Sequence, residues 1–294
     1  MRNDSASLSW RERPRASGLN PDVQELIRNA VFEIIPLSSA AEAIDALPAN
    51  SRVSVTASAA KGQTATLELA EELIRRGHRV TPHFSARLMR DRGQVKDLAE
   101  WTRDNGVATA FIIGGDTTEP GAYHDSHSFM RDLFEHPHGL STVGVAAYPD
   151  GHPVIGEGVR RHTLSAKQEL LAEASLRGYC STQMCFDPAR IIAWLKSERR
   201  NGLTLPVHLG IPGAVERARL LAIGTRLGVG QSLRYLRKHR RSMAKLLGSP
   251  THDPTEMLEA LSGQLVPLDI CGLHIFTFNQ VKTTAAWRQA LLHD

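Results

Sequence analysis

Short apolar runs alternate along the chain with longer segments in which apolar residues recur every three or four positions. The short runs are rich in Val, Ile and Phe, as strands are, and the longer segments have the spacing of amphipathic helices. One longer segment places Leu67, Ala70, Leu73 and Ile74 on a single helix face. The pattern predicts strands over residues 31–35, 52–56, 79–84, 108–113, 142–147, 178–185, 205–209 and 271–278.

Helices are predicted around these strands, over residues 40–47, 64–76, 90–105, 126–135, 164–177, 188–201, 214–227, 257–263 and 283–292. Asp187, directly before Pro188, is interpreted as a helix N-cap. Alternation of strands and helices predicts a parallel sheet with helical crossovers. Eight such units in one chain favour a single-domain (β/α)8 TIM barrel, a fold of roughly 250 residues. No GxGxxG motif follows the first strand, which argues against an open dinucleotide-binding sheet.

Two segments differ from this repeating pattern. Residues 1–20 are rich in Ser, Arg and Asn without an apolar period, so we expect a mobile N-terminal tail ahead of a barrel domain over 21–294. Residues 228–270 form a longer excursion between the seventh and eighth strands, which predicts two extra helices. This excursion contains a basic run at 234–241.

Composition narrows the possible partners. The chain has 35 Lys and Arg against 31 Asp and Glu, a net charge of +4 without the strong basic stripe of a nucleic-acid binder. No apolar run approaches the ~18 residues of a membrane helix, and the N-terminus has no signal-peptide core. The three cysteines lie in apolar segments without CxxC spacing, as expected of reduced core residues in a cytoplasmic protein. No metal-ligand motif is present, so we expect no metal site.

Polar residues at the predicted strand ends are the candidates for chemistry, because TIM barrels build their sites there. Glu33 stands alone in the apolar run Val-Phe-Glu-Ile-Ile-Pro. Burial favours the protonated form of a carboxyl group, so Glu33 is either a general acid or a structural residue paired with Arg or Lys. Thr56 and His83 end the second and third strands, as mouth-facing groups or as hydrogen-bonded structural residues.

Three further strand ends carry polar groups. Gly115 and Asp116 follow the fourth strand, where glycine permits a close backbone approach and the carboxylate either faces a ligand or forms a turn. Tyr148 and His152 follow the fifth strand. Gln183, in the sixth, offers a donor and an acceptor, which suits the edge of a heterocycle or a satisfied core amide.

Seven segments, in order between residues 31 and 280, together resemble the methylenetetrahydrofolate reductase family. They read F-E-I-I-P at 32–36, S-V-T at 54–56, P-H at 82–83, G-D at 115–116, A-A-Y-P-D-G-H-P at 146–153, T-Q-M-C-F-D at 182–187 and F-T-F-N at 276–279. Each motif is short, but their order and spacing are specific. The resemblance implies reduction of 5,10-methylenetetrahydrofolate to 5-methyltetrahydrofolate with hydride from NADH or NADPH.

The resemblance also implies roles for individual residues. Glu33 corresponds to the acid that opens the methylene bridge, and Asp116 and Gln183 correspond to residues that hold and polarise the pterin. Phe278 is expected as a further substrate contact. The residues expected on the cofactor side are Thr56, His83, Gly115, Tyr148 and His152.

The chain departs from the family pattern at positions that the family uses to bind its flavin. Ala172 stands where the family has a flavin-contacting Lys, Gly114 replaces the Arg of its R-G-D loop, and Gln280 replaces the Arg of its closing N-R. These changes remove positive partners for FAD. The pattern is similar to flavin-free mycobacterial relatives, and it predicts direct hydride transfer from the nicotinamide.

Other interpretations stay open at this stage. The chain is alternatively an FAD-dependent reductase with different flavin contacts, or a catalytically silent folate-binding barrel. A Schiff-base aldolase is disfavoured because Lys61 and Lys282, the lysines nearest strand ends, are poorly placed. The basic run at 234–241 is a solvated helix face or a docking surface for a folate's glutamate tail. The protein is a monomer or a small homo-oligomer, for which Trp287 is one candidate contact.

Overall fold

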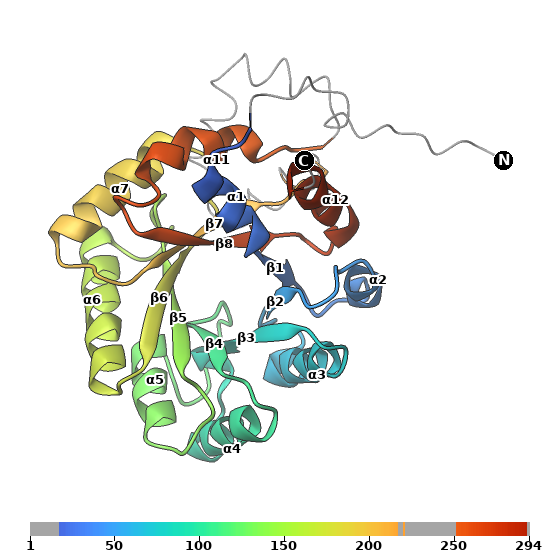
Figure 1. Ribbon diagram of the computed structural model, residues 1–294. Helices are drawn as coiled ribbons and strands as arrows, with labels where there is room; N and C mark the ends of the chain where they lie inside the picture. The colour runs from blue at the N-terminus through green and yellow to red at the C-terminus, as the bar shows by residue number, and fades with distance from the viewer. Residues whose placement is uncertain (1–17, 217–219, 221–250, 293–294) are drawn as a thin grey trace.

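A computed structural model describes residues 18–216, 220 and 251–292 (Figure 1). Eight parallel strands close into a barrel in which each strand pairs with its neighbours in the sequence and β8 pairs with β1. The predicted (β/α)8 TIM barrel is therefore confirmed. The strands are β1 (Val31–Ile34), β2 (Arg52–Val55), β3 (Arg79–Ser85), β4 (Thr109–Ile113), β5 (Thr142–Ala147), β6 (Arg177–Thr182), β7 (Val207–Pro212) and β8 (Ile270–Phe276).

Helices surround the barrel in the order that the sequence predicts (Figure 1). They are α1 (Pro21–Arg28), α2 (Ala40–Asp45), α3 (Gly62–Arg75), α4 (Arg92–Asp104), α5 (Ser126–Phe134), α6 (Glu157–Glu173), α7 (Pro188–Arg200), α11 (Thr255–Leu261) and α12 (Val281–Leu292), with short 3-10 helices η2 (Ala86–Leu88) and η3 (Ser262–Gln264). The expected N-cap of α7 is confirmed, since the Asp187 carboxylate accepts from the Ala189 and Arg190 amides. The sequence prediction missed α1, whose Val23, Leu26 and Ile27 are buried at helical spacing.

The two faces of the strands differ in chemistry, which positions the site. Alternate residues of a strand point to opposite faces of the sheet. Apolar residues such as Ile34, Val55 and Ile275 occupy one face and pack against the helices, forming the main core. The other face, inside the barrel, holds Glu33 and His274 among other polar and aromatic side chains. The barrel interior therefore holds side chains that can take part in chemistry as well as side chains that fill space.

Two glycines make room for the rings inside the barrel. A Cβ at Gly144 would collide with Tyr179 and Phe111, and a Cβ at Gly272 would collide with His208. The rings of Tyr179 and His208 stack with their centroids 4.2 Å apart. Large rings on some strands are thus accommodated by missing side chains on their neighbours, as close packing requires.

Several boundaries and assignments differ from the sequence predictions. Strand β6 ends at Thr182, so Gln183 follows the strand instead of lying within it, and β7 runs to Pro212. Cys180 and Cys185 are buried as expected, but Cys271 is exposed because it occupies a solvent-facing position near the start of β8. Trp287 is 1% exposed and donates to the Thr255 hydroxyl, so it packs inside the chain and does not supply a surface for a partner copy.

Parts of three predictions lie outside the described residues. These parts are residues 1–17 of the expected tail, residues 217–219 and 221–227 of the helix expected over 214–227, and residues 228–250 of the excursion, which include the basic run. Within that excursion, α11 and η3 are described. No helix of the described ranges is long and apolar enough to cross a membrane.

Candidate active site

A cavity of about 1020 Å³ opens at the end of the barrel where the strands finish and their following loops begin. Side chains from inside the barrel form its floor, including Glu33, His83 and His274. Its walls come from the loops after β4 and β5 and from α6 and α7. The position is the one that TIM barrels use for catalysis.

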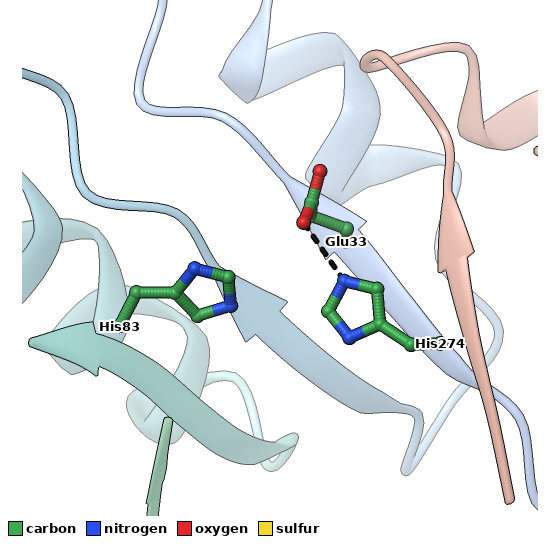
Figure 2. Close-up of side chains that lie close together, drawn as sticks. All are labelled: Glu33, His83 and His274. Atoms are coloured by element: carbon green, nitrogen blue, oxygen red, sulfur yellow. Dashed lines mark hydrogen bonds and ion pairs between the residues drawn. The ribbon is translucent and has the colours of Figure 1, made fainter. Parts of the chain in front are cut away.

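Glu33 lies on the cavity floor and is 5% exposed. Its Oε2 atom is 2.8 Å from Nε2 of His274, which belongs to the neighbouring strand β8 (Figure 2). The Thr277 hydroxyl donates to the Glu33 backbone carbonyl and so anchors the end of β1 to β8. The partner of this buried carboxyl group is thus a histidine, rather than the Arg or Lys that a purely structural role led us to expect.

His83 faces this pair from β3 (Figure 2). Its Nε2 atom is 2.6 Å from the Ser54 hydroxyl, and its ring centroid is 5.9 Å from that of His274. Burial, reinforced by the nearby His274, holds the pKa of His83 well below its usual value. His83 is therefore neutral at physiological pH and acts as a hydrogen-bonding group on the floor.

The same three side chains are the strongest candidate metal ligands among the described residues. One carboxylate oxygen and two imidazole nitrogens of Glu33, His83 and His274 lie within 4.8 Å of one another. Two ligand atoms that each lie roughly 2.1 Å from one zinc ion are at most about 4.2 Å apart. Nitrogens of both rings already have partners, Ser54 for His83 and Glu33 for His274. The arrangement fits a hydrogen-bonded network better than a coordination shell.

Asp116 lies on the cavity wall beside two aromatic side chains predicted for the cofactor side. Burial, and next the negative charge of Asp116, raise the pKa of Tyr148. Burial lowers the pKa of His152, and the Asp116 charge acts against that lowering. The rings of Tyr148 and His152 meet edge to face with centroids 5.0 Å apart. These three residues therefore form one group on the wall.

Gln183 begins the loop after β6 and is held by its backbone. Its amide donates to the Ala147 carbonyl at 2.7 Å, and its side-chain oxygen accepts from the Met184 amide at 3.0 Å. Among the described residues, no group accepts a hydrogen bond from its side-chain NH2, and the residue lines the cavity. A fixed donor is thus available to a bound ligand.

Seven of the nine predicted site residues line this single cavity: Glu33, His83, Gly115, Asp116, Tyr148, His152 and Gln183. Thr56 and Phe278 do not line it. Phe278 is 3% exposed and packs in an apolar cluster with Met184 and Phe186, because the chain leaves the strand and turns through a positive φ at this residue. Phe276, two residues earlier and still on β8, lines the cavity instead.

Sequence reasoning missed other lining residues. In the strand segment Leu273-His274-Ile275-Phe276, apolar residues facing the helices alternate with rings facing the barrel. This period-two alternation is the sequence signal that could have identified His274. Lys167, on α6, also lines the cavity, and it interrupts an otherwise apolar helix stripe.

The arginines on the cavity lining were also missed, among them Arg87 and Arg160. Arg87 donates to the carbonyls of His124 and Thr117, and Arg160 donates to the carbonyl of Ile155. These guanidinium groups are held by backbone oxygens, which fixes their position without neutralising their charge. No local sequence signal distinguished these residues from ordinary surface arginines.

No protein-family model matches this chain. Among solved structures, the chain is similar to an uncharacterized protein from Clostridium thermocellum that binds two copies of 5-methyl-5,6,7,8-tetrahydrofolic acid, with a TM-score of 0.54, 13% identity, and coverage of 92% of this chain and 96% of that one. A weaker similarity is to the dihydropteroate synthase of Thermus thermophilus, with a TM-score of 0.44, 13% identity, and coverage of 89% and 90%. At 13% identity, the likeness to the Clostridium thermocellum protein establishes the barrel fold alone.

Proposed function

We propose that this protein reduces 5,10-methylenetetrahydrofolate to 5-methyltetrahydrofolate with a hydride from NADH or NADPH. The observation that carries the proposal is the buried Glu33 carboxyl group, which faces into the barrel on the lining of the cavity that also holds Asp116 and Gln183. Burying a carboxyl group is costly, and its position on the floor of a cavity suits a proton donor to a bound substrate. The motif order described above supports the choice of a folate.

Residues of the protein supply the proton that opens the methylene bridge and stabilise the positive charge that develops on the substrate. Protonated Glu33 donates to N10 of the methylene bridge, so the bond between the bridge carbon and N10 breaks and a 5-iminium cation forms. His274, at 2.8 Å, holds the Glu33 carboxyl group in place. The Asp116 carboxylate stabilises the cation, and the free amide donor of Gln183 binds the pterin edge. When bound, the reduced nicotinamide supplies the hydride that converts the bridge carbon to a methyl group.

The cavity supports a ternary complex. Small-molecule sites commonly span about 300–1,000 Å³, and this cavity, with about 1020 Å³, lies just above that range. Direct hydride transfer requires the donor and acceptor carbons to approach within about 3–3.5 Å, so a pterin and a nicotinamide must occupy the cavity together. A flavin between them and direct transfer exclude each other.

The residues at the family's flavin-contacting positions favour the direct route. Gly114 lines the cavity and contributes no cation there. The Gln280 side chain accepts from the Glu216 amide at 2.8 Å and is used to hold a loop. Ala172 has no polar side chain. We therefore propose that NADH or NADPH, without FAD, is the redox partner.

The Clostridium thermocellum barrel supplies a fold-level analogy. That protein binds 5-methyl-5,6,7,8-tetrahydrofolic acid, which is the product of the reaction proposed for this chain. Because one fold hosts many functions, the analogy supports folate binding and leaves the reduction to be argued from the site.

Two measurements on the purified protein test the proposal. Its absorption spectrum is expected to lack flavin bands, and NADH or NADPH oxidation is expected to depend on added 5,10-methylenetetrahydrofolate. A stoichiometric flavin whose removal abolishes activity would replace direct transfer with the FAD-dependent route. Folate binding without any nucleotide oxidation would leave a silent binding protein.

The Glu33→Gln variant tests the proton donor. Loss of general acid catalysis is expected to lower kcat by about 10²–10⁴-fold while the product's dissociation constant changes little. Glu157→Gln is the matched control, since the Glu157 side chain is 73% exposed and pairs with Arg161 on its own helix. Unchanged kcat in Glu33→Gln would remove the basis of the proposed mechanism.

A further inference from the structure

Lys167 is a buried cation that the proposed proton transfer does not use. It lies on α6 and is 7% exposed. It shares the buried stripe of this helix with Leu164 and Leu171, at spacings of three and four residues where an apolar residue is normally found. Among the residues that the structure describes, none forms a hydrogen bond or an ion pair with its ammonium group.

An unpaired buried ammonium group destabilises the folded protein unless a ligand supplies the counter-charge. Burial lowers the pKa of Lys167 to about 8, and the negative charge of Asp125 acts in the opposite direction. Lys167 is thus protonated at neutral pH, with the Asp125 charge nearby but without a hydrogen bond or an ion pair to any described residue. Because Lys167 lines the same cavity as Glu33, its charge is available to a ligand bound there.

The N-terminus of α5 lies on the same wall of the cavity. Asp125 and Ser126, which begin this nine-residue helix, both line the cavity. Asp125 caps its own helix by accepting from the Ser128 amide at 2.9 Å. A helix N-terminus carries a partial positive charge and exposed backbone N–H groups, which suit phosphate. Because the Asp125 carboxylate caps this end of the helix, it offsets much of that partial charge. The ammonium group of Lys167 is therefore the main positive feature of this wall.

We propose that Lys167, on this wall of the cavity, binds the diphosphate of the nicotinamide dinucleotide. This inference rests on the proposed function, because it assigns a place to the anionic part of the hydride donor. A compact ammonium charge is suited to phosphate, whereas planar guanidinium groups match carboxylates in a bidentate manner. The glutamate carboxylates of a folate are accordingly assigned to the arginines elsewhere on the cavity lining, such as Arg87 and Arg160.

Equilibrium binding tests this assignment without requiring turnover. NADH and ADP-ribose, which contains the diphosphate but lacks the nicotinamide, are titrated calorimetrically into wild type, Lys167→Met and Lys167→Arg. We expect Lys167→Met to weaken both ligands by at least tenfold, and Lys167→Arg to stay within about threefold of wild type. The dissociation constant of 5-methyltetrahydrofolate is expected to change less than twofold.

Lys96→Met is the matched control for the loss of one lysine charge. Lys96 lies on α4, its side chain is 61% exposed, and it pairs at 3.8 Å with Glu100, away from the cavity lining. Thermal melting checks the fold, and the ligand-free Lys167→Met variant is expected to have a higher Tm than wild type because it no longer buries an unpaired charge.

The possible outcomes separate the inference from the proposed function. If Lys167→Met binds NADH and ADP-ribose as wild type does, the diphosphate site is wrong while the reductase proposal stands. If only 5-methyltetrahydrofolate weakens, Lys167 serves the folate and the dinucleotide assignment is overturned. If wild type binds neither NADH nor NADPH, the proposed function itself fails.

Discussion

The floor of the cavity and the wall that carries Lys167 differ in whether their buried ionisable groups have partners. On the floor, Glu33 is hydrogen-bonded to His274 and His83 to Ser54, so each polar side chain has a partner from another strand. On the wall, Lys167 is equally buried and has no partner among the described residues.

The difference distinguishes two roles that buried polar groups can have. A satisfied network fixes the position of its members, as a proton donor requires. An unsatisfied charge costs stability in the free protein and gains its partner only when a ligand binds. We therefore expect changes on the floor to act mainly on turnover and changes on the wall to act mainly on nucleotide affinity.

The largest effect is expected from removing His274, the hydrogen-bond partner of Glu33. His274→Phe leaves the carboxyl group unsupported, and we expect kcat to fall by about 10–100-fold, since a hydrogen bond to a chargeable group is worth roughly 1.5–3 kcal/mol. His274→Gln retains an Nε2 donor and should recover part of the rate. Steady-state kinetics across pH distinguishes this role from packing, because only a positioning role shifts the pH profile of kcat. Equal NADH dissociation constants in both variants would show that His274, on the floor, does not contribute to nucleotide binding at the wall.

The pH dependence of nucleotide binding sharpens the comparison from the side of the wall. With the pKa of Lys167 lowered to about 8, NADH affinity is expected to be full below that pH and to fall about tenfold per unit above it, because the ligand binds the charged form. The charged and titratable groups on the adjoining elements are His124 and Asp125 before α5 and Arg190 and Glu198 on α7.

Calorimetric titrations between pH 7 and 9.5 provide the measurement. Lys167→Arg should give a flat profile, since arginine stays protonated throughout this range. A wild-type profile that is equally flat would indicate that the ammonium group does not contact the nucleotide.

The smallest expected effect comes from Ser54→Ala, which removes the partner of His83. Leaving the buried His83 nitrogen unsatisfied should lower the free energy of unfolding by about 1–3 kcal/mol. Denaturant unfolding measures this loss, and NADH affinity should stay within twofold of wild type. A large loss of nucleotide affinity would mean that the floor also contributes to cofactor binding.

The sequence by itself determined the architecture and much of the lining of the cavity. Apolar periods of two and near 3.6 residues follow from which faces of strands and helices must be buried, so the eight strands and most helices could be located from local pattern alone. Polar residues at strand ends identified Glu33, Asp116 and Gln183, because the fold class dictates where strand ends meet. The cap at Asp187 required only its local sequence.

Closure of the barrel decided what local pattern could not. Glu33 and His274 are 241 residues apart and meet only because β8 pairs with β1. Whether Phe276 or Phe278 reaches the cavity depended on where β8 ends and the backbone turns. Lys167 became a wall residue through the packing of α6 against its neighbours, since spatial contacts between distant segments, unlike periodicity, arise only once the whole chain is packed.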